Sequence, residues 1–225
     1  MRELRSASFV ALHGEPGSGK SALLDVLADR AREHKLRVVF DLEDLRPPVV
    51  AILDDLEDAE PLAALLRAPP RGGVLIAFAC RRLAPGLARA LEAAARRGEL
   101  LDLPLAPLTA EEMAGHPPAL QRLSGGNPFY LSELAAHARG VPPRIVAAVE
   151  EELAHLSEPA RTLVHGAAVA GEDLDLALAA AGMEEDLAAL DEAIASGLLQ
   201  GTGRRYRFRH PIVRLAAYEC TGPGW

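Results

Sequence analysis

Eight consecutive residues near the start of the chain match a phosphate-binding pattern. The run GEPGSGKS fits G-x-x-x-x-G-K-[ST] in full. Glycines let the backbone turn so that N–H groups point at phosphate oxygens, and a helix beginning near Lys20 adds the positive end of its dipole. In such a loop the lysine reaches the β- and γ-phosphates, and the serine hydroxyl coordinates Mg²⁺. The sequence therefore predicts an ATP/ADP site with Mg²⁺, in which Lys20 is catalytic and Ser21 is a metal ligand.

The predicted nucleotide-binding residues of this loop are Gly14, Glu15, Pro16, Gly17, Ser18, Gly19, Lys20, Ser21 and Ala22. The alternative interpretation is a glycine-rich turn that binds nothing, or a degenerate loop that has kept only its shape.

Two acids follow the apolar run 49–53. In open α/β sheets, ligands bind at the carboxyl ends of strands, where Asp54 and Asp55 are expected. Mg²⁺ prefers one or two carboxylates besides phosphate oxygens, so Asp54 is the second predicted metal ligand. Asp55 is predicted to orient the attacking water. The alternative is a solvated acidic turn shared with Glu57, Asp58 and Glu60.

A basic pair follows the apolar run 74–80. Arg81, the first of the pair Arg81 and Arg82, is predicted to sense the γ-phosphate or to stabilise its charge in the transition state. Arginines at strand ends are also common on protein surfaces, so a solvated residue is the alternative.

The elements around these residues should form a parallel sheet covered by helices. Residues 8–12 have the pattern of a buried strand, and apolar residues repeat with helical spacing over 21–34. Further strands are expected at 37–42, 49–53 and 74–79, which are apolar on both faces. Residues 101–108 should end this α/β core as an extended segment.

The remainder of the chain has helical patterns. Thr109 and Glu112 have the form of a capping box before a helical stretch, and a second helix is expected over about 130–138. Helices at about 144–156, 158–169, 174–180 and 184–196 precede two strand-like pieces within 198–208. Three helices, a hairpin and a closing helix resemble a winged helix. The expected domains are a P-loop α/β domain (1–108), a helical lid (109–141) and a winged-helix-like domain (142–225).

Composition excludes several classes of protein. Of the 225 residues 49% are hydrophobic but 4% aromatic, which favours closely packed helices. The formal charge of −8 disfavours nucleic acid and acidic membranes as partners. Cys80 and Cys220 suit reduced thiols better than a disulfide framework. There is no apolar run of about 20 residues and no secretory signal, so a cytoplasmic protein is expected.

The order of motifs resembles one family. These motifs are GEPGSGKSALL, VVAILDDL, VLIAFACR, LPLAPLTAEE, RLSGGNPFYLSEL and YRFRHPIVRLAAYE. Together they look like the AAA-like ATPase module of STAND-type signal-transduction ATPases, especially that of large LuxR-type transcriptional regulators. The resemblance covers nearly the whole chain. The separate DNA-binding domain of such regulators has no counterpart among the motifs.

The resemblance implies a switch with slow Mg²⁺-dependent ATP hydrolysis. In that family an ADP-bound closed form opens when ATP and an inducer bind, and hydrolysis resets it. By similarity, Pro128 would pack on the adenine and His210 would reach the ADP phosphate. ATP-dependent self-association is compatible with this mode of action. Without the family, Pro128 lies in a turn and His210 near a helix start.

Two departures from the family leave other functions open. Only residues 43–48 separate two expected parallel strands, where a crossover normally takes a dozen residues or more, so a helix is missing. The lid is also short. A non-catalytic interaction module with a vestigial loop is therefore one alternative, and a P-loop kinase or transferase is another.

Direct DNA binding is not expected. The predicted helix before the hairpin is acidic and carries no Lys or Arg, whereas a recognition helix needs basic residues. The hairpin is basic, through Arg204, Arg205, Arg207 and Arg209. This cluster is predicted to face the nucleotide domain or an acidic partner surface.

Overall fold

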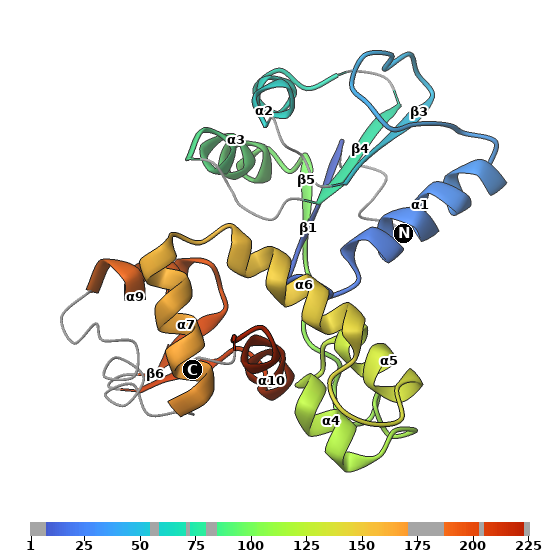
Figure 1. Cartoon of the computed structure of the whole chain (residues 1–225). Coiled ribbons are helices and arrows are strands. Elements are labelled where there is room, and N and C mark those ends of the chain that lie inside the picture. Colours follow the sequence, from blue (N-terminus) through green and yellow to red (C-terminus); the bar gives the residue numbers. More distant parts are fainter. Residues whose placement is uncertain are drawn as a thin grey trace. The chain divides into compact units, whose positions relative to one another are not determined.

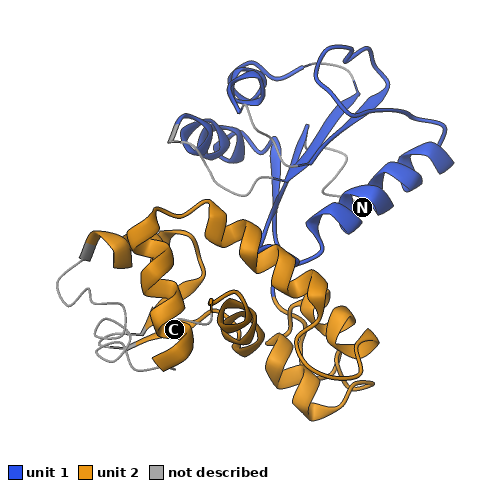
Figure 2. Cartoon of the chain, viewed as in Figure 1, with its two compact units in different colours: residues 1–106 blue, residues 107–225 orange. Residues whose placement is uncertain are grey.

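The chain divides into two compact units, residues 1–106 and residues 107–225 (Figure 2). The computed structural model describes residues 8–54, 59–70, 73–79, 85–170, 187–202 and 205–222. The finer division at residues 108 and 141 stays a prediction.

Unit 1 is built on a five-stranded parallel sheet with the order β2-β3-β4-β1-β5 (Figure 1). Its central strands consist of apolar residues that are buried on both faces, which is typical of a parallel sheet. The predicted α/β class is confirmed. The strands are β1 (Phe9–His13), β2 (Arg37–Val39), β3 (Val49–Leu53), β4 (Val74–Ala79) and β5 (Leu100–Pro104).

Helices cover both faces of this sheet (Figure 1). Helix α1 (Lys20–Glu33) packs its buried residues Leu24, Ala28 and Ala31 on one face, with Val10 and Leu12 of β1. Helices α2 (Glu60–Arg67) and α3 (Pro85–Arg96) pack on the other face, which Phe9 and Ala11 supply. Alternate residues of one strand thus point into two separate cores, as the period of two requires.

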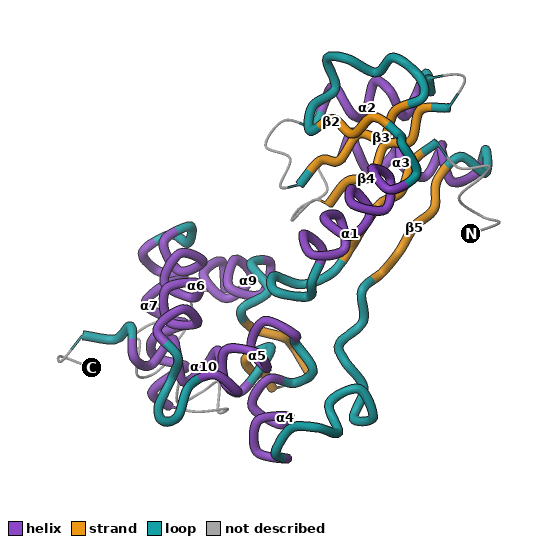
Figure 3. Tube along the Cα trace, turned by 90° about the vertical axis from the view of Figure 1, so that its right-hand side faces the viewer, coloured by secondary structure: helices purple, strands orange, loops and turns teal. Residues whose placement is uncertain are grey.

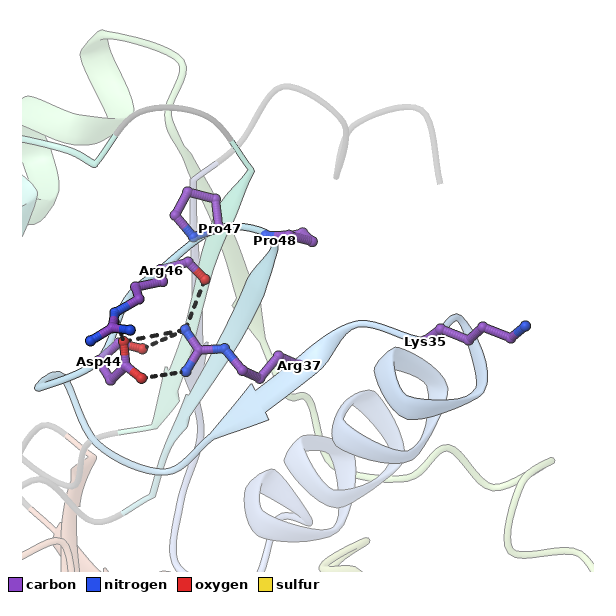
Figure 4. Close-up of a pocket in the computed structure, with 6 residues that line it drawn as sticks. All are labelled: Lys35, Arg37, Asp44, Arg46, Pro47 and Pro48. Atoms are coloured by element: carbon purple, nitrogen blue, oxygen red, sulfur yellow. Dashed lines mark hydrogen bonds and ion pairs between the residues drawn. The ribbon is translucent and has the colours of Figure 1, made fainter.

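The connection from β2 to β3 contains no helix, as the sequence predicts. Strand β2 ends at Val39, earlier than the predicted residue 42, and residues 40–48 run irregularly to β3. Arg37 holds this connection through its guanidinium (Figure 4). Its Nη1 donates to Oδ2 of Asp44 at 2.7 Å, and its Nη2 donates to the carbonyls of Asp44 at 2.9 Å and Arg46 at 2.8 Å. The hydrogen bond between the side chains of Arg37 and Asp44 lowers the pKa of the Asp44 carboxyl below its ordinary value.

A pocket of about 380 Å³ lies beside this connection. In Figure 4 the side chain of Lys35 points away from the ion pair of Arg37 and Asp44. Arg37 and Val49 are the first residues of their strands, so the pocket is at the amino edge of the sheet. The predicted phosphate loop follows the carboxyl end of β1, so this pocket is not the candidate nucleotide site. Its remaining lining residues are Arg46, Pro47 and Pro48.

Replacing Arg37 by glutamine should lower the melting temperature by a few degrees. The variant loses a charged donor that holds two carbonyls and a carboxylate, and the nine-residue connection gains freedom to move. Thermal unfolding followed by circular dichroism measures the effect. Arg30→Gln is the control, because Arg30 makes an exposed ion pair with Glu33 and such pairs contribute little. Equal losses in the two variants would contradict the role given to Arg37.

The described part of unit 2 is mostly helical and includes an antiparallel hairpin (Figure 3). Its core joins α5, α6, α7, α9 and α10 with the hairpin, in which Leu199 pairs with Phe208. The helix expected at 174–180 lies outside the described residues. The elements are α4 (Pro118–Ser124), α5 (Pro128–Ala136), α6 (Pro143–Ala154), α7 (Glu158–Ala170), α9 (Leu187–Ala195), β6 (Leu199–Thr202), β7 (Arg205–Phe208) and α10 (Pro211–Glu219).

The prediction of a helix that starts after Thr109 is wrong, although the predicted capping box is present. The backbone N–H and the hydroxyl of Thr109 donate to Oε2 of Glu112 at 2.8 and 2.9 Å. These bonds close a single turn, and the next helix begins only at Pro118. A residue before proline is driven out of the α region, so a helix cannot run through Pro117 and Pro118.

Among the described residues, no helix has the length and apolar character needed to cross a membrane.

Candidate functional site

The predicted phosphate loop joins the end of β1 to the start of α1. Gly17 and Gly19 have φ angles of 79° and 95°, in the left-handed region that favours glycine. Gly19 is the residue before the helix, and its carbonyl accepts the backbone N–H of Leu23 at 2.9 Å. The first N–H groups of α1, which precede the hydrogen-bond ladder within the helix, therefore belong to the loop, and this is the arrangement that binds anions.

The loop closes tightly on its first glycine. A Cβ atom on Gly14 would lie 2.5 Å from Oγ of Ser18 and 3.2 Å from Cβ of Leu105. The backbone N–H of Leu105 donates to the carbonyl of His13 at 2.7 Å, and Nε2 of His13 lies 2.8 Å from Oδ1 of Asp102. The segment after β5 thus supports the loop from one side. A side chain at position 14 would open this cradle.

Lys20 folds back over the loop. Its Nζ donates to the carbonyls of Gly14 at 2.9 Å and Glu15 at 2.8 Å. The hydroxyl of Ser18 is buried and has no hydrogen-bond partner within the part of the chain that the structure describes. A positive charge, a buried hydroxyl and the start of a helix are thus gathered within one turn of chain. This donor set fits a phosphate group.

Asp54 follows β3 at the same edge of the sheet as the loop. Strand β4 lies between β3 and β1, so two strand spacings, roughly 10 Å, separate the strand of Asp54 from that of the loop. Asp54 is exposed. The chain leaves β1 toward the face of α1 and leaves β4 toward the face of α3. Such a switch in direction creates the crevice where open α/β sheets bind ligands.

The two predicted catalytic residues besides Lys20 cannot be placed. Asp55 and Arg81 lie outside the described residues, as do Glu57 and Asp58 of the acidic-turn alternative. Their roles stay predictions.

Comparison with known proteins supports the fold. No protein-family model matches the chain, and no curated protein matches it. It is similar to the structure of a Walker-type ATPase of Pyrococcus abyssi, with 12% identity and a TM-score of 0.58, over 96% of this chain and 92% of that one. The chain has the fold of a Walker-type ATPase.

Two further structural likenesses have TM-scores below 0.5. One is a STAND protein with a tetratricopeptide repeat sensor from Pyrococcus horikoshii (17% identity, TM-score 0.43), of which this chain covers 42% while 99% of this chain is matched. The other is the Orc1 protein of Aeropyrum pernix, solved in complex with DNA (12% identity, TM-score 0.47), with 95% of this chain and 87% of that chain covered.

The remaining predicted nucleotide contacts, Pro128 and His210, both lie in unit 2. Pro128 is the first residue of α5, and His210 is the residue before α10. A Cβ atom on Gly125, in the turn before α5, would lie 2.2 Å from Nδ1 of His210. The ring of His210 also meets the ring of Tyr130 edge-on, with centroids 5.5 Å apart. Because these residues belong to the other unit, their roles toward a nucleotide in the loop stay predictions.

The turn that carries Pro128 is rigidly bonded. Asn127 is fully buried, and its Oδ1 accepts the backbone N–H groups of Phe129 at 3.1 Å and Tyr130 at 3.2 Å. The carbonyl of Gly126 accepts the N–H of Leu108 at 2.8 Å. The asparagine therefore serves as an N-cap, a function that the residue types around a glycine turn could have predicted.

The prediction that the basic hairpin cluster faces the nucleotide domain or an acidic partner surface is wrong for Arg209. Its side chain is 2% exposed and forms a two-pronged ion pair with Glu152 of α6. Burial by itself lowers the pKa of this guanidinium, but the hydrogen bond and charge of Glu152, with Tyr130, hold the pKa above its ordinary value. Arg207, two residues earlier, is exposed. Strand β7 ends at Phe208, so Arg209 lies beyond the strand and does not share the outward face of Arg207.

Within the described residues there is no group of three or more His, Cys, Asp or Glu side chains placed to hold a metal ion. Mg²⁺ does not need such a group, since it keeps several waters and takes phosphate oxygens as ligands. Ser21 at the first turn of α1 and Asp54 at the end of β3 are the described residues that would complete its shell.

Proposed function

We propose that this chain is a nucleotide-dependent switch that binds ATP or ADP with Mg²⁺ at the 14–22 loop and hydrolyses ATP slowly. The observation that carries the proposal is the loop itself, in which Lys20 lies over two loop carbonyls at the junction of β1 and α1. The Walker-type ATPase fold around it supports the same interpretation.

Each residue has a defined task in this proposal. The loop N–H groups and Lys20 bind the phosphates, and Ser21 and Asp54 hold Mg²⁺. When bound, the metal ion neutralises charge on the β- and γ-phosphate oxygens. Asp55 orients the attacking water, and Arg81 stabilises the γ-phosphate. Lys20 leaves the carbonyls of Gly14 and Glu15 for the phosphate, so it exchanges two hydrogen bonds to neutral groups for bonds to an anion.

A switch is favoured over a fast enzyme by the second unit. Pro128 and His210 are proposed to contact the adenine and the ADP phosphate, so that ATP and ADP stabilise different states of the chain. The motif resemblance to LuxR-type regulators suggests that the chain is part of, or derived from, a cytoplasmic transcriptional regulator. A kinase or transferase would need an acceptor substrate, and its turnover would depend on adding one.

Titration of the chain with ATP and ADP, with and without Mg²⁺, tests the proposal. We expect calorimetric binding of both nucleotides and turnover that requires Mg²⁺. Asp54→Asn should weaken the Mg²⁺-dependent part of ATP binding roughly tenfold, as expected for the loss of one ionic interaction. Glu60→Gln, in α2 of the same acidic region, should change nothing. If the two variants behave alike, Asp54 belongs to a solvated acidic turn.

A non-catalytic interaction module is the second candidate. It is favoured by the nine-residue connection between β2 and β3, in which a crossover helix is missing. A folded chain that binds neither nucleotide would support this candidate and refute the switch.

A further inference from the structure

One buried guanidinium joins three segments of unit 2. Nη2 of Arg209 donates to Oη of Tyr130 at 2.7 Å and to Oε1 of Glu152 at 2.7 Å, and Nη1 donates to Oε2 of Glu152 at 2.6 Å. Tyr130 and Arg209 are 79 residues apart, and Glu152 and Arg209 are 57 apart. Helix α5, helix α6 and the end of β7 are therefore held at one point.

The group is enclosed and has little tolerance for change. Tyr130 is 1% exposed, the side chain of Glu152 is 21% exposed, and Nε of Arg209 is buried without a hydrogen-bond partner in the described parts of the chain. A buried ion pair adds little net stability compared with apolar packing, but losing one partner leaves an uncompensated charge. The group therefore fixes the relative positions of its three segments more than it stabilises the fold, and this suits a positioning role.

The next residue along the chain is His210, which is 6% exposed. Its ring packs against the ring of Tyr130 in a T-shaped arrangement, and it occupies the space that a side chain on Gly125 would need. The backbone N–H of Arg209 donates to the carbonyl of Leu198 at 3.0 Å, which fixes the chain just before the histidine. The position of the imidazole thus depends on the contacts that hold Arg209.

We infer that Arg209, held by Glu152 and Tyr130, is a positioning residue that sets the imidazole of His210 against the glycine turn before Pro128. The two unit 2 contacts proposed for the nucleotide then move as one block. This inference rests on the proposed function only where it concerns ADP. Its structural part concerns unit 2 alone.

Two variants weaken the contacts that hold Arg209, each in a different way. Tyr130→Phe deletes one hydroxyl and keeps the ring that packs on His210, so it preserves the core. Glu152→Gln keeps the shape of the acceptor and removes its charge. Arg207→Gln is the control, because it changes an exposed arginine of β7 that lies two residues before Arg209 and makes none of these contacts with Tyr130 or Glu152. All variants are made in the full chain, and circular dichroism checks that each one is folded.

The first measurement is the ring resonance of His210 in the nucleotide-free chain, assigned by comparison with His210→Gln. We expect this resonance to shift or broaden in Tyr130→Phe and Glu152→Gln and to stay unchanged in Arg207→Gln. A His210 resonance that is unchanged in both Tyr130→Phe and Glu152→Gln overturns the inference, whether or not the chain binds nucleotide.

The second measurement is the release rate of a fluorescent ADP analogue. We expect release about tenfold faster in Tyr130→Phe, the effect of losing one hydrogen bond to a charged group. The rate in Arg207→Gln should equal that of the wild type. A changed resonance with unchanged release overturns the nucleotide part of the inference. A wild-type chain that binds no ADP refutes the proposed function instead, and the resonance then decides the positioning role.

Discussion

Replacing Lys20 by alanine should weaken binding of ATP and ADP by roughly two to four orders of magnitude. The estimate takes two hydrogen bonds between the ammonium and phosphate oxygens at about 1.5–3 kcal/mol each. The variant should stay folded, because the bonds it loses in the free chain, to the carbonyls of Gly14 and Glu15, lie at a partly exposed loop. The increase in melting temperature that nucleotide gives the wild type should disappear.

The sequence offers a matched control for this experiment. Lys20 and Lys35 are the only lysines in a chain rich in arginine, and Lys35 lies just beyond the other end of α1. Lys35→Ala removes the same charge without touching the loop and should bind nucleotide like the wild type. Lys20→Arg should not restore binding, because a planar guanidinium does not replace a compact ammonium. Nucleotide affinity that survives in Lys20→Ala would refute the phosphate-binding role.

Replacing Gly126 by alanine should destabilise unit 2 by about 3 kcal/mol. Gly126 has a φ of 84°, and a Cβ atom there would lie 2.6 Å from the carbonyl oxygen of Leu108 and 2.9 Å from Cβ of Pro107. Left-handed strain accounts for about 1 kcal/mol of this estimate, and the forced shift of packed backbone accounts for the remainder. The same shift would break the hydrogen bond between Leu108 and Gly126.

Gly140→Ala separates the two contributions. Gly140 has a φ of 76°, yet nothing lies within 4 Å of a Cβ atom at that position. This variant should therefore lose only about 1 kcal/mol, from backbone strain. Denaturant unfolding of both variants measures the difference. If they lose the same stability, the turn before Pro128 is not tightly packed on residues 107–108.

The parallel sheet could be predicted because its signal is local. Strands β3 and β4 begin and end as the apolar runs 49–53 and 74–79 do. Strand β2 is shorter than its apolar pattern, since Phe40 beyond its end is 61% exposed. Side-chain bonds from Arg37 shape the following segment, and a hydrophobicity pattern carries no information about such bonds.

The first residues of helices in unit 2 were less predictable because proline can either begin a helix or interrupt one. Pro128 and Pro143 are first residues of helices, although the predicted helices begin later, at about 130 and 144. Proline lacks an N–H group that the first helical position does not use, and its fixed φ suits that position. Counting proline only as a breaker shifts the boundary by one or two residues.

The candidate site was predictable where its residues are close in sequence. The loop needs only a strand, a glycine turn and a helix in succession, and the structure has all three. The role of Arg209 was not predictable, because its partners Tyr130 and Glu152 lie far away in the chain. The run of arginines predicted contact with the nucleotide domain or an acidic partner surface, and only the packing of unit 2 shows that Arg209 turns inward.

The short β2 strand affects how this sheet can meet another chain. Among the described strands, β2 and β5 are the two edges of the sheet, and an edge exposes backbone groups that could pair with a neighbouring molecule. Strand β2 offers only three residues for such pairing, and β5 ends at Pro104, which has no N–H to donate. The short β2 strand and the proline at the end of β5 therefore limit aggregation by edge-to-edge extension of the sheet.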